Sequence, residues 1–185
     1  MFDPGKVEKA IKDLLVGLGE DPDRDGLKET PKRVTKMYAQ VMNGYDEDPE
    51  QHLKLFEDDS DEMVVVKDIP MYSFCEHHMA LFHGKMHIAY IPQGKVIGLS
   101  KLIRIARVFA KRLQIQERLG KQVADFLVEK LSPLGVAVVI EAEHTCMSLR
   151  GVRTPGAVTK TAVLKGAFRD NLETRNEFYS LIGKQ

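Results

Sequence analysis

The stretch from Tyr72 to His78 places a thiol, a carboxylate and two imidazoles in the four consecutive positions from Cys75 to His78. Cys75 and His78 have Cys-x-x-His spacing, which lets one turn of backbone direct both side chains at one ion such as zinc. The second of the two cysteines, Cys146, also has a histidine near it, His144. If that segment is a strand, positions 144 and 146 point to the same face. The sequence therefore favours a zinc site built from two distant segments.

Other interpretations of the cysteines stay open. A free cysteine is most often a small buried hydrophobic residue. A disulfide is disfavoured, because two cysteines are too few for a stapled secreted fold and we recognise no signal sequence, so we expect a cytoplasmic protein. A closed structural site would use Cys75, His78, His144 and Cys146 and leave no position for water. His77 is a spare imidazole beside these four candidates, and together they favour metal binding.

Length and charge limit the class of protein. A chain of 185 residues with 43% hydrophobic residues can bury one good core, so a single domain with a small appendage is expected. Lys plus Arg equals Asp plus Glu at 27 each, which argues against a general nucleic-acid binder. No apolar run reaches the ~18 residues of a membrane span. Nine basic residues and one acidic residue lie between Lys85 and Lys121, so this region is expected to receive a negative group.

An acidic run divides the chain. The residues from Glu57 to Glu62 lack the glycine and the spaced ligands of a calcium loop, so we interpret them as a solvated linker. We expect an N-terminal helical region at 1–62 and a second region at 63–185. In the first region, one helix is expected from Asp3 to Gly19 and another from the cap Thr30 to Gly44.

The second region is rich in short β patterns separated by helical ones. A break is expected at His83-Gly84, and Ser100 is expected to cap a helix whose first turn holds Lys101 and Arg104. Cations there oppose the helix dipole, so either an anion binds them or they are solvated surface charges. The other expected elements are strands at 63–67, 85–91, 136–142 and 157–164, a helix from about Ile115, and a last helix with a capping box at Asp170 to Glu173.

Six ordered motifs closely resemble the GTP cyclohydrolase I family. Their spacing and the pattern at residues 21–34 extend the resemblance over nearly the whole chain. One departure is Leu113, where the family commonly has proline. The motifs are Cys75–His78, Tyr90–Pro92, Gly98–Lys101, Gln114–Leu119, His144–Cys146 and Arg150–Arg153.

The resemblance implies an α+β tunnelling fold, with an antiparallel four-stranded sheet and an antiparallel helix pair preceded by N-terminal helices. It further implies a toroidal homodecamer with active sites between subunits. The implied reaction is hydrolytic opening of the guanine imidazole ring of GTP at C8. Formate leaves and 7,8-dihydroneopterin triphosphate forms, the first step of tetrahydrofolate and pterin biosynthesis.

The resemblance also implies roles for individual residues. One zinc ion per subunit would be held by Cys75, His78 and Cys146, and its open position would lower the pKa of water to roughly 7. His77 and His144 would move protons, and Ser100 would assist ribose opening. Glu76 would have a supporting role. The implied substrate-binding residues also include Gln116. Glu117 would accept hydrogen bonds from the guanine edge, and Lys101, Arg104 and Arg150 would contact the triphosphate.

Two alternatives remain beside this reading. Another tunnelling-fold enzyme acting on a pterin or deazapurine would typically need three histidines or a nucleophilic cysteine. A non-catalytic zinc protein would bind purine nucleotides for regulation and close its site with four protein ligands, including His144. Without the resemblance, Glu117 would be interpreted as an ordinary acidic residue in the first turn of a helix, where it interacts favourably with the helix dipole.

Overall fold

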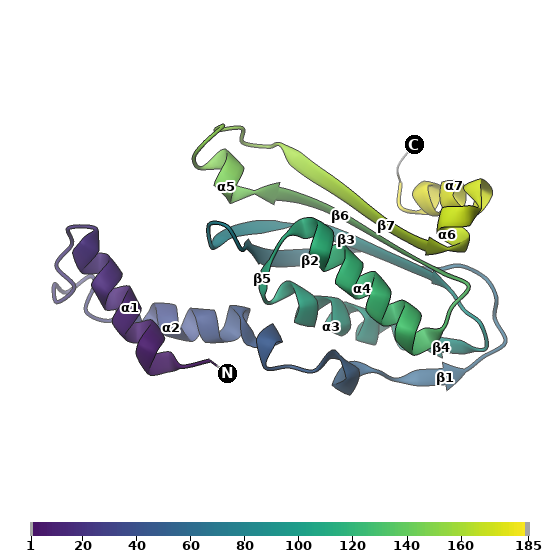
Figure 1. Ribbon diagram of the computed structural model, residues 1–185, viewed down its shortest axis with the longest axis horizontal. Coiled ribbons are helices and arrows are strands. Elements are labelled where there is room, and N and C mark those ends of the chain that lie inside the picture. The colour runs from purple at the N-terminus through teal and green to yellow at the C-terminus, as the bar shows by residue number, and fades with distance from the viewer. Residues whose placement is uncertain (1, 184–185) are drawn as a thin grey trace.

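A five-stranded sheet forms the centre of the computed structural model, which describes residues 2–183 (Figure 1). The strand order is β5-β2-β3-β6-β7. The four long strands pair antiparallel, and the short β5 pairs in parallel with the end of β2. Their bounds are β2 Val64–Cys75, β3 Ala80–Ile91, β5 Leu113–Gln114, β6 Gly135–His144 and β7 Val158–Gly166.

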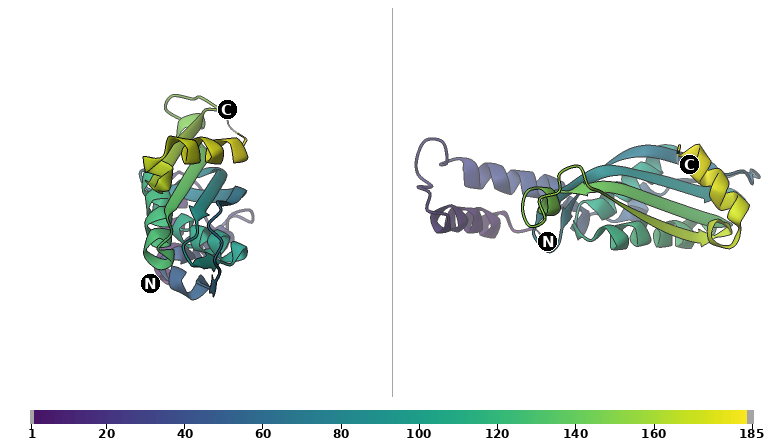
Figure 2. Two further views of the ribbon diagram at one scale, coloured as in Figure 1. Left: turned by 90° about the vertical axis from the view of Figure 1, so that its right-hand side faces the viewer. Right: turned by 90° about the horizontal axis from the view of Figure 1, so that it is seen from above.

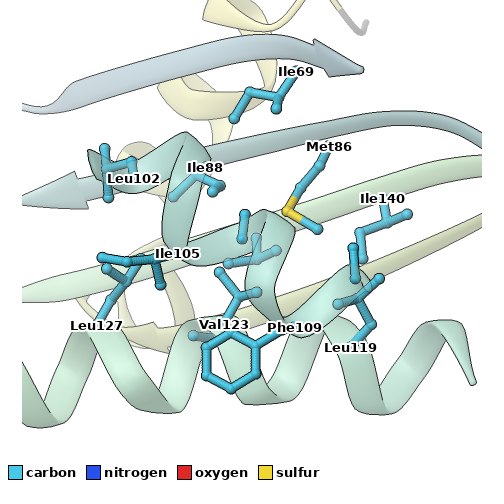
Figure 3. Close-up of a cluster of buried hydrophobic side chains, with 14 of the residues drawn as sticks. Ile69, Met86, Ile88, Leu102, Ile105, Phe109, Leu119, Val123, Leu127 and Ile140 are labelled. Carbon is cyan, nitrogen blue, oxygen red and sulfur yellow. The ribbon is translucent and has the colours of Figure 1, made fainter. Parts of the chain in front are cut away.

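Helices α3 (Leu99–Ala110) and α4 (Gln116–Leu131) cover one face of this sheet. Figure 3 shows their apolar side chains meeting those of the strands, for example Leu127 and Leu119 of α4 near Ile88 and Ile140. All four of these side chains are fully buried. Burying one such side chain contributes about 1.5–3 kcal/mol, so this layer holds the helix pair on the sheet. The expected α+β class, with an antiparallel four-stranded sheet and a helix pair, is confirmed.

The opposite face of the sheet is covered over part of its area by two C-terminal helices, α6 (Ala167–Asp170) and α7 (Leu172–Leu181). Phe168 and Phe178 are fully buried there against alanine and valine side chains of β3 and β6. These helices form the smaller of the two apolar clusters. Among residues 2–183, no helix is both long and apolar enough to span a bilayer.

The helices α1 (Pro4–Gly17) and α2 (Thr30–Val41) form an arm that projects beyond one end of the sheet (Figures 1 and 2). The 3₁₀ turn η1 (Asn43–Tyr45) joins the arm to the body, because the Gly44 N–H donates to the Lys111 carbonyl at 3.1 Å. A second 3₁₀ turn, η2, spans Pro49–His52.

A small second sheet lies beyond η2. Strand β1 (Leu55–Glu57) pairs with β4 (Lys95–Ile97). The expected division into regions 1–62 and 63–185 stays a prediction, and its outer ends, residues 1 and 184–185, lie outside the described residues.

Three expected helix caps are wrong by one or two positions. Thr30 is already the first residue of α2, and Glu29 precedes it as the cap. Ser100 lies inside the first turn of α3, whose cap is Gly98. The last helix is capped by Asn171, whose side chain accepts from two backbone N–H groups, because Asp170 belongs to the short helix α6 before it. Glu29 and Gly98 make no side-chain cap hydrogen bond, so a search for capping side chains locates these two helix starts only to within one or two residues.

The expected break at His83-Gly84 is also wrong, because both residues lie inside β3. Gly84 pairs with Ala142 of β6. A Cβ atom at position 84 would lie only 1.9 Å from the Glu141 carbonyl oxygen. Glycine therefore permits close approach of two strands here and does not end one.

Replacing Gly84 with alanine is expected to destabilise the protein by about 2 kcal/mol or more, since the new methyl group meets backbone that cannot move aside. Thermal or urea unfolding measures this change. Gly17→Ala is the matched control, because nothing lies within 4 Å of a Cβ atom there. Equal stability of Gly84→Ala and the unchanged protein would contradict this account of the strand.

Candidate active site

The strand register brings three chain segments together at one end of the sheet. Cys75 is the last residue of β2 and pairs with Ala80 on one side and with Gln114 of β5 on the other. On the next strand pair, Phe82 lies opposite His144, the last residue of β6. The β2–β3 turn, β5 and the short helix α5 (Thr145–Ser148) therefore gather at the same end, on the left of Figure 1.

The turn after β2 directs His78 back toward Cys75. Met79 has a positive φ of 51° and its N–H donates to the Cys75 carbonyl at 2.8 Å. His78 Nδ1 lies 4.0 Å from Cys75 Sγ. His77 Nδ1 lies 3.6 Å from the same sulfur, but 64% of the His77 side chain is exposed. Both imidazoles of the motif thus lie close to one thiol.

Cys146 reaches this thiol from a short helix. The idea that one strand carries both His144 and Cys146 is wrong, because β6 ends at His144 and α5 (Thr145–Ser148) follows at once. The Thr145 hydroxyl donates to the Leu81 carbonyl at 2.6 Å and ties the start of α5 to β3. The potential ligand atoms of Cys75, His78 and Cys146 all lie within 4.8 Å of one another.

These three donors fit a tetrahedral zinc ion. Zinc–sulfur and zinc–nitrogen bond lengths put neighbouring ligand atoms about 3.5–3.8 Å apart, close to the 4.0 Å between Cys75 Sγ and His78 Nδ1. Both cysteines are free thiols. Burial, with Cys75 close by, raises the pKa of Cys146 above its ordinary value. The thiol is therefore protonated at neutral pH until a cation displaces its proton.

His144 lies outside this group of three. Its Nε2 is 2.8 Å from the Gln116 side-chain oxygen, and its ring stacks on Phe82 with 4.6 Å between centroids and 5° between planes. Burial lowers the pKa of His144, while the charge of Glu117 acts in the opposite direction. A half-buried imidazole held in this way is suited to exchange protons with a ligand.

An ion pair links the metal turn to the start of α4. The Arg118 guanidinium binds the Glu76 carboxylate and also donates from Nε to the Gln114 side-chain oxygen at 3.1 Å. The hydrogen bond from Arg118 lowers the pKa of Glu76. Glu117, the neighbour of Arg118, is exposed in the first turn of α4. Glu76 and Arg118 thus connect Glu117 to the segment that carries Cys75.

The expected substrate-binding residues do not all lie at this end. Arg150 does, because its Nη1 is 2.9 Å from His78 Nε2. Ser100 and Lys101 lie in the first turn of α3, next to β4, and α3 ends just before β5. A helix of 12 residues is about 18 Å long. Ser100 and Lys101 are therefore at the opposite end of α3 from the cysteines, with Arg104 between.

Gln116 does not lie at the surface of the site, although it is one of the expected substrate-binding residues. Gln116 is only 2% exposed, and its amide group makes hydrogen bonds with β6, β7 and His144. Little hydrogen-bonding capacity remains for a nucleotide. Phe82 and Arg118 are functional candidates that sequence reasoning missed, since only their three-dimensional partners identify them.

Several curated proteins similar to this chain carry the same name. A model of the GTP cyclohydrolase I family matches residues 7–183. GTP cyclohydrolase 1 of Pelotomaculum thermopropionicum is 56% identical over 187 residues, covering 100% of both chains. The Carboxydothermus hydrogenoformans protein is 55% identical, over 100% of this chain and 97% of its own. The Mycobacterium tuberculosis protein is 52% identical, over 98% and 92%.

Among solved structures, an archaeosine synthase in its apo form covers 56% of this chain and 93% of its own. Its TM-score is 0.43 and its sequence identity 16%. This likeness is too weak to carry an argument.

Zinc binding to the metal-free protein is expected to release protons at pH 7, because the raised pKa keeps Cys146 as a thiol until the metal displaces its hydrogen. Zinc affinity should accordingly fall as the pH is lowered. Titration calorimetry in buffers of different ionisation enthalpy counts the released protons. Binding without proton release would show that Cys146 is not a ligand, and Cys146→Ser provides the comparison.

Proposed function

Because this chain belongs to the GTP cyclohydrolase I family and is an enzyme of that activity, we propose that Cys75, His78 and Cys146 hold its catalytic zinc ion. The reaction opens the guanine imidazole ring of GTP at C8, with release of formate and formation of 7,8-dihydroneopterin triphosphate. The observation that carries the proposal is the convergence of two sulfurs and one imidazole nitrogen within 4.8 Å.

A set of three ligands suits catalysis better than a closed structural site. A zinc ion with three protein ligands keeps one position for water and lowers the pKa of that water to roughly 7. His144, the fourth ligand of the closed alternative, is instead bound to Gln116 and stacked on Phe82. This geometry supports an open site, and it leaves His144 available for proton transfer.

Glu117 is proposed to recognise the guanine base. Guanine presents its N1–H and its amino group as adjacent donors on one edge, and a carboxylate can accept from both. Glu117 is exposed at the start of α4, and the adjacent Arg118 is anchored to Glu76. His144 and His77 would then exchange protons with the ring nitrogens as the imidazole ring opens.

The triphosphate site is proposed to form between subunits. Arg150 lies beside His78, but Ser100 and Lys101 lie at the far end of α3 from the cysteines. A second copy of the chain could bring its own Ser100, Lys101 and Arg104 to this metal site. That arrangement supports the proposed ring of ten subunits, in which each active site combines residues of different copies. A cytoplasmic location stays a prediction.

The alternative of a non-catalytic nucleotide-binding protein does not apply, since relatives of the same length are named as enzymes. Another tunnelling-fold activity is disfavoured by the donor set. Three histidines do not converge in the one metal-ligand group found among residues 2–183, which contains two cysteines and one histidine.

His144→Ala is expected to keep zinc and lose turnover by a factor of roughly 10²–10⁴, the usual contribution of a general acid or base. Metal analysis and detection of formate and of the oxidised, fluorescent pterin measure the two effects. Cys146→Ala is the matched comparison and should lose both zinc and activity. Metal-free His144→Ala protein would instead identify His144 as a ligand.

Glu117→Gln is expected to lower kcat/KM for GTP roughly 30-fold or more, about 2 kcal/mol, because an amide presents one donor where guanine needs an acceptor. The loss should be smaller for inosine triphosphate, which lacks the amino group. Steady-state kinetics with both nucleotides test this. An equal loss of kcat/KM for the two nucleotides would show that Glu117 does not contact the guanine amino group.

A further inference from the structure

We propose that Gln116 is a positioning residue that holds His144 in one tautomer, with hydrogen on Nε2 and the lone pair on Nδ1. The inference rests on the proposed function in one respect, the role of His144 in proton transfer. It differs from the direct substrate contact expected for Gln116. The geometry on which it stands involves β6, β7 and α4, and none of it requires a bound nucleotide.

The orientation of the Gln116 amide is fixed by its surroundings. Its Nε2 lies 3.0 Å from the Ile140 carbonyl oxygen and 3.1 Å from the Thr159 carbonyl oxygen. It also lies 3.1 Å from the Thr161 hydroxyl. Carbonyl oxygens only accept hydrogen bonds, so the NH₂ group must face them. Turning the amide by 180° would place its oxygen against two carbonyl oxygens in a buried place, which is strongly unfavourable.

The Gln116 oxygen therefore faces His144. It lies 2.8 Å from His144 Nε2, and an amide oxygen can only accept. The ring nitrogen must donate, so Nε2 carries a hydrogen in the neutral ring and also in the charged ring. In a neutral imidazole the other nitrogen then holds the lone pair. Nδ1 of the neutral ring is consequently the atom through which His144 can accept a hydrogen bond.

Stacking prevents the ring from escaping this arrangement. The His144 ring lies parallel to that of Phe82, which is fully buried and occupies the paired position on β3. A half-turn about χ2 keeps the stack but replaces Nε2 with a carbon atom at the Gln116 oxygen. The hydrogen bond would be lost and the buried oxygen left unsatisfied, at a cost of about 1–3 kcal/mol. Phe82 and Gln116 together define one ring orientation.

The first test is a nitrogen-15 NMR measurement of the zinc-loaded protein without nucleotide, at a pH that keeps the imidazole neutral. The expected result for His144 is hydrogen on Nε2 and none on Nδ1. Hydrogen on Nδ1 would overturn the proposal. This result does not depend on turnover. Failure to form formate from GTP would count against the proposed function alone.

The second test is Gln116→Met, which keeps the length of the side chain and removes its hydrogen bonds. We expect a mixture of His144 tautomers, a loss in kcat of at least about tenfold, and a change in KM below about threefold. The zinc content should stay the same. A raised KM with unchanged kcat and unchanged tautomer would identify Gln116 as a direct substrate contact and overturn the proposal.

Lys121→Ala is the control, because Lys121 is exposed on the same helix and pairs with Asp125 away from His144. The His144 tautomer signal and the kinetics of this variant should equal those of the unchanged protein. If Gln116→Met does not fold, the NMR measurement on the unchanged protein still decides the proposal.

Discussion

Backbone pairing between β3 and its two neighbours brings together the chain segments that carry Cys75, His78, His144 and Cys146. The pairing of Cys75 with Ala80 and of Phe82 with His144 places the ends of β2 and β6 side by side. Shifting either pairing by one residue would turn these side chains to the other face of the sheet. The apolar layer under α3 and α4 holds that register, since the same alternation buries Met86, Ile88 and Ile140. Packing and chemistry thus depend on one alignment.

The features predicted from sequence are those that depend on neighbouring residues. Helical periodicity located α1 to α4, and the Cys-x-x-His spacing located two of the three residues of the candidate metal group. Gly84 was wrongly predicted to end a strand, because the contact that requires glycine there is with the Glu141 carbonyl on another strand. The contacts of Gln116 could not be predicted from sequence for a similar reason. Its partners Thr159 and Thr161 follow it by more than 40 residues, and no local pattern reveals them.

Burial has two opposing effects at the site. It raises the pKa of Cys146 and lowers that of His144, so both groups are disfavoured as ions in the metal-free chain. A bound cation would favour the ionised thiolate of Cys146. The charge of the nearby Glu117 partly offsets the lowering of the His144 pKa. The same partial burial lets Phe82 and Gln116 hold the His144 ring. Burial therefore fixes the orientation of the His144 ring, while the charges of Cys146 and His144 depend on what the site binds.

If active sites are shared between copies, as proposed, the separation of Ser100 and Lys101 from the cysteines has a genetic consequence. In an assembly whose active sites are shared between copies, a chain lacking Cys146 still offers its intact α3 end, and a chain lacking Lys101 still offers its intact cysteine end. Each mutation therefore removes a different half of the shared active site. Co-expressed mutants of the two kinds would rescue one another in mixed rings, although either alone is inactive. Two mutants damaged in the same half would show no such complementation.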